Sequence, residues 1–320
     1  MIKEIPAREL DAEWFIDQKV KEINTAVGDE KAINALSGGI DSSAVTMLGH
    51  LALGKRLKTV FIENGLMREG ESAQVVNTFH QLGVPVEVVD AKKEFFDALK
   101  GLTDPEEKRE ALTQTFYKKV FSRILKQSGA KFLLQGTILT DIDETVAGIK
   151  RQHNVFAQLG IDPHEAFGYH IVEPLIQLRK EGVRKLGRAL GLPSEIFERI
   201  PFPGPALSAR VIGEVTPERV DLVRAATVIV EEEVAAHKPF QAFAVLLEDK
   251  GTGIVEGKRH FGNIIIVRSV ESKDAMTAEP SPLPWATLMR ISKRITAELP
   301  QVTRVAYELT AKPPATIEYI

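Results

Sequence analysis

The sequence predicts an α/β protein, with a doubly wound parallel sheet in residues 1–198 and a smaller α+β domain in residues 199–320. Strand-like apolar runs alternate with helix-like segments through the first part, which is the pattern of parallel βαβ units. A loop rich in proline and glycine (IPFPGP) at 200–205 interrupts this alternation and marks the boundary. Beyond it, strand-like runs next to one another with helices on one side are typical of an α+β arrangement.

The first domain is expected to contain short strands joined by helices. The apolar run AINAL at 32–36 indicates a strand, and the apolar residues at 44, 45, 48, 51 and 52 share one face of a helix over 42–53. The remaining elements are expected as a helix within 1–30, strands at 58–63 and 84–89, a helix at 71–82, charged helices within 91–128 and a strand at 132–134.

The second domain is expected to begin with a long helix at 217–236. Strands at 242–247 and 263–268, a helix at 285–297 and a strand near 305–309 follow. The segment GTGIVEG at 251–257 has its third glycine in the wrong place for a dinucleotide fingerprint. We therefore expect it to be a flexible surface loop.

Composition limits the class of function. The chain has 320 residues, of which 44% are hydrophobic and 27% charged, and a net charge of -3. This balance is typical of a globular protein and gives no basic excess for a nucleic acid, so a small-molecule or protein partner is expected. No apolar run is long enough to span a membrane, and the acidic N-terminus does not resemble a secretory signal. These features predict a cytoplasmic protein.

The sequence contains no cysteine. Disulfides, thiolate metal sites and a cysteine nucleophile are therefore excluded for this chain. Any reaction that depends on a protein thiol, such as cysteine-dependent glutamine hydrolysis, must be performed elsewhere.

The strongest chemical signal is the loop SGGIDSS at 37–43, between a strand and a helix. Its glycines allow a tight turn and close approach of an anion, and the helix N-terminus and serine hydroxyls add donors. This predicts a phosphate or pyrophosphate site, although a capped serine-glycine turn has the same local pattern. Asp41 would repel phosphate, so we interpret it as a ligand of Mg²⁺ that bridges phosphates. The predicted loop residues are Ser37, Gly38, Gly39, Ile40, Asp41, Ser42 and Ser43.

The loop resembles the signature SGGxDS of the N-type ATP pyrophosphatases. Other motifs resemble the GMP synthase family nearly throughout the chain and in order: FIENGLMREGE at 61–71, GLTDPEEKR at 101–109, QGTILTDIDE at 135–144, IKRQHN at 149–154, PFPGP at 201–205, ESKDAMTA at 271–278 and AKPPATIE at 311–318. The resemblance covers the ATP pyrophosphatase and dimerisation parts of that family. The glutamine amidotransferase part has no counterpart in this sequence.

The resemblance implies a ligase reaction that uses ATP and Mg²⁺. The C2 oxygen of xanthosine 5′-monophosphate (XMP) attacks the α-phosphate of ATP, and pyrophosphate leaves. Ammonia then displaces AMP and gives GMP. A separate glutamine amidotransferase subunit would supply the ammonia, and the second domain would form a homodimer.

The resemblance also implies residue roles. Asp41, Asp141, Glu144 and Lys150 are the expected catalytic residues, and Gly136, Thr137, His153 and Arg68 are expected to join the loop in binding ATP or pyrophosphate. The expected XMP ligands are Arg210, Lys312, Thr316 and Glu318. Residues 138–165 are expected to form a mobile lid. Read singly, some of these residues have simpler interpretations: Lys150 as a solvated charge, and the acids at 141–144 as helix caps.

The sequence departs from the family pattern mainly on the acceptor side. Ala206 stands where PFPGPGLAIR-like segments have glycine, and the DGMTADWA-like segment reads DAMTAEPS at 274–281. Two alternatives therefore stay open: an ATP pyrophosphatase acting on a different acceptor, and a nucleotide-binding regulator without activity. NAD synthetase shares the loop but not the KPPATIE tail.

Overall fold

The computed structural model describes residues 2–146, 169–197, 202–255, 257–273 and 275–319. The chain forms two compact units. Unit 1 comprises Met1–Glu63, Ser72–Asp90 and Tyr117–Arg199, and unit 2 comprises Asn64–Glu71, Ala91–Phe116 and Ile200–Ile320. Two stretches from the first half of the chain therefore belong to the same unit as its C-terminal part.

Unit 1 is built on a five-stranded sheet in the order β3-β2-β1-β4-β5. All neighbouring strands in it are parallel. The strands are β1 (Ala32–Ala35), β2 (Leu57–Glu63), β3 (Val86–Asp90), β4 (Phe132–Leu134) and β5 (His170–Val172). This order confirms the predicted doubly wound sheet. From β1 the chain adds β2 and β3 on one side and then β4 and β5 on the other, so the switch point lies between β1 and β4. Open α/β sheets bind ligands at such a switch point, beyond the carboxyl ends of the strands.

Helices connect the strands of unit 1. They are α1 (Ala12–Val27), α2 (Ile40–Leu53), the short 3₁₀ helix η1 (Gly54–Arg56), α3 (Glu71–Gln81), the π-helical stretch η2 (Thr115–Phe121), α6 (Ser122–Ser128), α7 (Leu139–Val146), α9 (Lys180–Ala189) and α10 (Ser194–Phe197). Local signals explain some boundaries: the Asp11 side chain accepts from the Trp14 amide at 3.0 Å and caps α1. Neither β5 nor α9 was predicted from the sequence.

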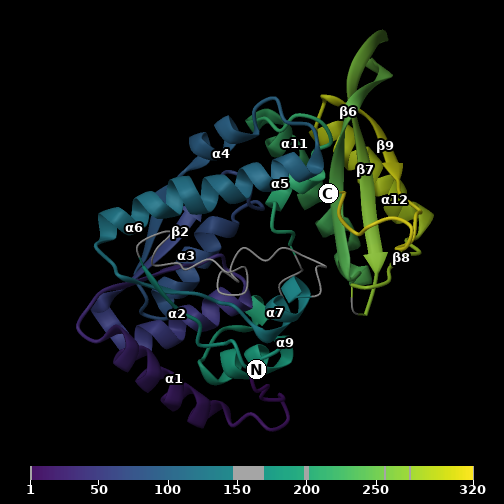
Figure 1. Cartoon of the computed structure of the whole chain (residues 1–320). Helices are drawn as coiled ribbons and strands as arrows, with labels where there is room; N and C mark the ends of the chain where they lie inside the picture. Colours follow the sequence, from purple (N-terminus) through teal and green to yellow (C-terminus); the bar gives the residue numbers. More distant parts are fainter. Residues whose placement is uncertain (1, 147–168, 198–201, 256, 274, 320) are drawn as a thin grey trace. The chain divides into compact units, whose positions relative to one another are not determined.

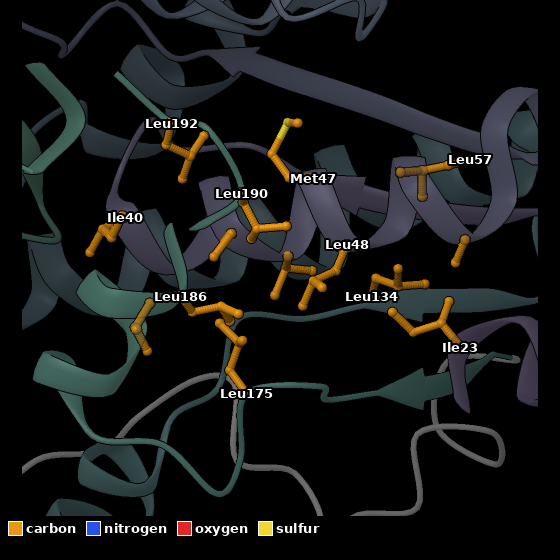
Figure 2. Packing of buried hydrophobic residues seen from close by; sticks show 14 of the residues in the cluster. Ile23, Ile40, Met47, Leu48, Leu57, Leu134, Leu175, Leu186, Leu190 and Leu192 are labelled. Carbon is orange, nitrogen blue, oxygen red and sulfur yellow. The ribbon is translucent and has the colours of Figure 1, made fainter. Parts of the chain in front are cut away.

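One apolar cluster of unit 1 lies between the sheet and the helices α1, α2 and α9. Leu48 of α2, Leu134 of β4 and Leu186 and Leu190 of α9 gather in one apolar cluster (Figure 2). Gly187 of α9 permits this packing, because a Cβ there would lie 2.8 Å from the Ile40 Cδ1 atom. The last turn of α9 thereby packs closely against Ile40, the first residue of α2.

Unit 2 contains a second sheet in which a long hairpin of β6 (Gln241–Val255) and β7 (Lys258–Glu271) dominates (Figure 1). β8 (Glu279–Pro280) is antiparallel to β7, whereas β9 (Val302–Tyr307) is parallel to it. The helical elements are α4 (Lys92–Leu99), α5 (Pro105–Gln114), η4 (Ala206–Arg210), α11 (Pro217–Val234), η5 (Ala235–His237) and α12 (Trp285–Glu298). Helices α11 and α12 pack on each other. In addition, α11 packs on β6 and α12 packs on β9.

The expectation of a flexible loop at 251–257 is wrong for its first part. β6 continues through Val255, and Gly251 pairs with Gly262 of β7. Glycine serves close packing here, since a Cβ on Gly253 would lie 2.8 Å from the Thr303 Cγ2 atom. The glycines let β9 lie against the hairpin, and they do not indicate flexibility.

Hydrogen bonds hold the two early stretches within unit 2. Arg224 of α11 donates to the carbonyl oxygens of Gly65 at 2.6 Å and Met67 at 2.9 Å. Lys108 of α5 is buried and donates to the Val211 carbonyl at 2.9 Å. Burial lowers the pKa of Lys108, and the nearby positive charge of Arg219 lowers it further. These bonds link side chains to backbone carbonyls far away in the sequence.

Ala206 occupies the left-handed region of backbone space, with φ of 55°. This conformation costs a residue with a Cβ about 1–2 kcal/mol. We expect Ala206→Gly to be more stable than Ala209→Gly by about 1–2 kcal/mol in urea unfolding, because only the first relieves strain. Ala209 is the matched control, since it lies in the same 3₁₀ turn, is equally buried and has no positive φ. Equal losses in both variants would contradict the prediction.

Candidate active site

The SGGIDSS loop leaves β1 at the switch point and enters α2. Gly38 has φ of 78°, and Gly39 is the N-cap of α2 without a side-chain capping bond. The amides of the first turn therefore remain available to an anion, as at other helix N-termini that bind phosphate. The Ser42 hydroxyl closes the loop, because it lies 2.9 Å from the Ser37 Oγ atom and donates to the Gly39 carbonyl at 3.0 Å.

Buried polar side chains fix this loop to the sheet. Thr46 donates to the Ser42 carbonyl at 2.8 Å and accepts from the Asn34 amide at 2.6 Å. Thr59 of β2 in turn donates to the Asn34 Oδ1 atom at 2.8 Å. A buried network whose hydrogen bonds are all satisfied favours a single geometry. These bonds therefore fix the position of the loop relative to β1 and β2.

Asp41 lies in the first turn of α2 and pairs with Lys180 of α9. The Lys180 Nζ atom is 2.6 Å from the Asp41 Oδ2 atom. The other carboxylate oxygen, Oδ1, is buried and accepts from no group in the described part of the chain, and the same holds for the buried Ser43 hydroxyl. Polar atoms buried without a partner are rare and indicate a ligand position.

Lys180 was not among the residues predicted from the sequence. A lysine at the first position of a helix is unfavourable, because the helix dipole places positive charge there. A lysine at the start of a helix therefore suggests a negatively charged partner, and Asp41 is that partner.

The segment after β4 lies directly against the loop. A Cβ on Gly136 would be 3.2 Å from the carbonyl carbon of Asp41 and 3.3 Å from the amide nitrogen of Ser42, so only glycine permits this approach without a shift. Thr137 is buried, and its hydroxyl donates to the carboxylate of Glu173 at the end of β5. The structure thus brings Gly136 and Thr137 to the predicted pyrophosphate loop.

Asp141 lies in the first turn of α7 and accepts from the Ile138 amide at 3.0 Å. This is a capping contact, and it keeps the carboxylate beside the loop at 136–138. Glu144 lies in the same helix, and its side chain is outside what the structure describes. Lys150, His153 and most of the predicted lid also lie outside the described residues. Their roles stay predictions.

Glu173 is half-buried behind Thr137, and this burial raises its carboxyl pKa. Its folded-state pKa lies above the unfolded one, so its stabilising contribution is complete at acid pH and disappears as pH rises through the folded pKa. We therefore expect Glu173→Gln to raise the melting temperature at pH 8 and to have little effect below pH 4. Glu87→Gln, which removes an exposed carboxylate of β3, is the control. A gain that is equal at both pH values would contradict the assignment.

Arg210 and Glu318, two of the predicted acceptor residues, meet in unit 2. Arg210 has 1% of its side chain exposed and donates to both oxygens of Glu318, at 3.1 and 2.9 Å. Gln241 of β6, which was not predicted from the sequence, donates to the same carboxylate at 2.8 Å. The Arg210 Nη1 atom is buried and has no acceptor among the described residues. A buried guanidinium with an unused donor fits an oxygen-rich ligand.

Arg68 belongs to this cluster in unit 2. Its guanidinium lies 4.4 Å from the ring centre of Phe202, and Arg210 lies 5.2 Å from the same ring. Burial raises the pKa of the Glu231 carboxyl, whereas Arg68 and Arg210 act in the opposite direction. The expected contact of Arg68 with ATP or pyrophosphate stays a prediction, and the Phe202 ring is a neighbour that Arg68 shares with Arg210.

Lys312 and Thr316 lie on the C-terminal segment. The Lys312 Nζ atom donates to the Ala275 carbonyl at 2.7 Å, and the Thr316 hydroxyl donates to the Glu318 carbonyl. One donor direction of Lys312 is thus used within the protein, and an ammonium group has three. Both side chains therefore have a defined place on the chain segment that also carries Glu318.

Two features are absent from the described residues. No group of three or more histidine or acidic residues in them is arranged to hold a metal ion. Among the same residues, no helix is both long and apolar enough to cross a membrane.

Two family models match parts of the chain. The model described as the GMP synthase C terminal domain matches residues 229–319. The model described as NAD synthase matches residues 10–125, which include the SGGIDSS loop.

A glycine- and serine-rich loop between a strand and a helix N-terminus, at the switch point of a parallel sheet and joined to a small α+β unit, is the arrangement of nucleotide-binding α/β enzymes. A protein from Archaeoglobus fulgidus that is named as one subunit of glutamine-hydrolyzing GMP synthase is 50% identical over 310 residues, 97% of this chain and 100% of that relative. Proteins of the same name from Thermococcus kodakarensis and Methanopyrus kandleri are 51% and 47% identical, over 96% and 97% of this chain and 99% of each relative. The chain belongs to the family that these GMP synthase subunits form.

Proposed function

We propose that the chain is the synthetase subunit of a two-subunit GMP synthase. In this reaction ATP adenylates the C2 oxygen of XMP and releases pyrophosphate, and ammonia then displaces AMP to give GMP. The observation that carries the proposal is the pyrophosphate loop, whose first-turn amides, serine hydroxyls and Asp41–Lys180 pair lie together at the switch point. The similarity to GMP synthase subunits over nearly the whole chain supports the choice of XMP as acceptor.

On the ATP side, we assign pyrophosphate binding to the loop. Ser37, Ser42 and Ser43 supply hydroxyl groups, and Lys180 supplies a positive charge at the same place. Nucleotidyl transfer requires positioning and charge neutralisation more than a covalent protein group, and this loop offers both. Gly136 and Thr137 set the position of the adjoining segment, where Asp141 is held by its bond to the Ile138 amide.

Asp41 is the residue that would hold Mg²⁺. Its buried Oδ1 atom has no partner among the described residues, and Mg²⁺ is typically held by one or two carboxylates together with substrate phosphates. The donor set therefore fits a metal ion bound jointly by Asp41 and ATP. When bound, Mg²⁺ neutralises charge on the phosphates.

On the acceptor side, we assign XMP to the cluster of Arg210, Glu318, Thr316 and Lys312. Lys312 suits a 5′-phosphate, because a lysine ammonium is a compact charge with several donors. The buried Arg210 donates to Glu318 and retains a free Nη1 donor among the described residues, which suits a carbonyl or phosphate oxygen. Residues 1–198 would then be the ATP pyrophosphatase domain, and 199–320 the dimerisation and XMP-binding domain.

We assign the supply of ammonia from glutamine to a separate chain. The absence of cysteine excludes cysteine-dependent glutamine hydrolysis by this one, which supports a separate amidotransferase subunit as partner. We further propose a homodimer, as the resemblance to the family implies, and a cytoplasmic location, as expected from the sequence.

The test is GMP formation from XMP, ATP, Mg²⁺ and ammonium by the purified chain, with products separated by chromatography. The expected products are GMP, AMP and pyrophosphate in equal amounts. Cleavage of ATP only with another acceptor would retain the pyrophosphatase function and remove XMP. No ATP cleavage with any acceptor, either alone or with an amidotransferase subunit, would favour a nucleotide-binding regulator.

A further inference from the structure

Arg268 of β7 is fully buried, yet the proposed function gives it no role. Its exposed fraction is 0%, and it lies opposite Phe243 of β6 in the sheet. A buried guanidinium is costly unless its donors find acceptors and its charge is compensated. The groups that satisfy Arg268 therefore indicate what the side chain does.

The Arg268 guanidinium binds two carbonyl groups of the C-terminal segment. Its Nη1 atom donates to the Thr310 carbonyl at 2.5 Å, and its Nη2 atom donates to the Thr316 carbonyl at 3.1 Å. Because the guanidinium is planar and its donors point in fixed directions, these bonds set the two carbonyls relative to each other. A single side chain thus holds both ends of the loop at 310–316.

Two further residues tie the same segment to Arg268. The Glu308 Oε1 atom lies 3.5 Å from the Arg268 Nη1 atom, and the Tyr319 hydroxyl donates to the Glu308 carboxylate. Burial and this bond to Glu308 raise the pKa of Tyr319, so the hydroxyl keeps its proton at neutral pH. Glu308, which precedes the loop, therefore compensates the charge of Arg268. Tyr319, which follows the loop, holds the Glu308 carboxylate in place.

The loop carries the side chains assigned to the acceptor. Lys312 lies within it, and its backbone exchanges hydrogen bonds of 2.7 and 3.1 Å with Ala278. Glu318 follows the loop and reaches Arg210. The directions of these two side chains depend on the path of the backbone between them. The bonds from Arg268 to the Thr310 and Thr316 carbonyls fix that path.

We propose that Arg268 is a positioning residue for the acceptor nucleotide: it holds the loop at 310–316 so that Lys312 and Glu318 are presented in the binding geometry. This inference rests on the proposed function, because it takes these two side chains as ligands of XMP. The Nη1 and Nη2 atoms of Arg268 both donate to carbonyls of the loop, so we assign its effect to the loop and not to a contact with the nucleotide.

Arg268→Lys is the first test, because it keeps the charge and removes the fork that spans two carbonyls. We expect KM for XMP to rise about tenfold or more, by analogy with the loss of residues that orient direct ligands, whereas KM for ATP changes by less than about twofold. A second readout does not depend on activity. Hydrogen exchange of the amides of Lys312 and Ala315, which are bonded in the intact loop, should become faster.

Two variants accompany it. Arg304→Lys changes an exposed arginine on the neighbouring strand β9 and should alter neither KM nor exchange. Tyr319→Phe removes only the hydroxyl that donates to Glu308, and it should change both readouts in the same direction as Arg268→Lys but less. If Arg268→Lys does not fold, Tyr319→Phe serves as the test of the positioning role.

Lys312→Ala separates this inference from the proposed function. If Lys312→Ala raises KM for XMP while Arg268→Lys and Tyr319→Phe leave it unchanged, the positioning role is overturned and the acceptor site stands. If KM for XMP is unchanged in all three variants, the acceptor assignment fails, and the positioning role fails with it. A rise in all three, together with faster exchange in the two variants of the Arg268 network, is the result we expect.

Discussion

Asp41→Asn is expected to lower kcat for GMP formation by about a thousandfold or more, while the melting temperature changes by only a few degrees. The substitution keeps the shape of the side chain and removes the charge that faces Lys180 and the proposed Mg²⁺ position. Charge stabilisation at a transferring phosphoryl group commonly contributes 10²–10³-fold or more to rate, roughly. Asp41 has 25% of its side chain exposed, so the fold does not depend on it.

The matched control is Asp97→Asn. Asp97 of α4 also accepts from a lysine, with the Lys93 Nζ atom 2.6 Å away, but both side chains are largely exposed. Surface pairs of this kind contribute little, typically about 0–1 kcal/mol, so turnover and stability should be unchanged. The rates come from pyrophosphate release under saturating substrates. If Asp41→Asn retains turnover within about tenfold of the parent chain, Asp41 is not the metal ligand.

The strand, glycine turn and helix around the SGGIDSS loop were predictable because their signal is local. Two glycines between an apolar strand and an amphipathic helix dictate a tight turn, and three serines supply donors within a few residues. Lys180 is a different case, because it lies 139 residues from Asp41 along the chain. No local pattern brings α9 to α2, and that approach depends on close packing at Gly187.

The same distinction explains the fold. The strands at 58–63 and 84–89 and the helix at 42–53 have apolar spacings that decide their type, and the structure has β2, β3 and α2 there. Strand β5 is only three residues long and begins with a histidine, so its local signal is weak and it forms because the sheet offers it a partner in β4. Both strands of the hairpin were predicted at 242–247 and 263–268, but their extension through 251–257 was missed, because its glycines are typical of loops in a sequence pattern.

The acceptor site could be located from the sequence only through resemblance. Arg210, Gln241 and Glu318 come from three distant segments, and each is an ordinary polar residue in its own local context. The association of 64–71 with unit 2 was also unpredictable, because it depends on the bonds from Arg224 to the carbonyls of Gly65 and Met67. Tertiary packing alone assembles this site.

Lys312→Ala is expected to raise KM for XMP by about ten- to a hundredfold and to leave KM for ATP within about twofold. The physical reason is the loss of a charge-assisted contact with the 5′-phosphate, which is typically stronger than a neutral hydrogen bond. The Lys312 ammonium also donates to the Ala275 carbonyl, so its stem is already oriented and little order is lost when the phosphate binds. Steady-state kinetics with each substrate varied in turn provide both constants.

Lys250→Ala is the control for this prediction, because Lys250 is an exposed lysine of β6 in the same unit. It tests whether any loss of positive charge weakens binding of an anionic nucleotide through the general field of the protein. High salt sharpens the comparison, since it screens such long-range effects but leaves a direct contact largely intact. Equal increases of both Michaelis constants in Lys312→Ala would indicate a general disturbance of unit 2. A rise confined to XMP, which persists in salt and is absent in Lys250→Ala, is what direct recognition of the acceptor phosphate requires.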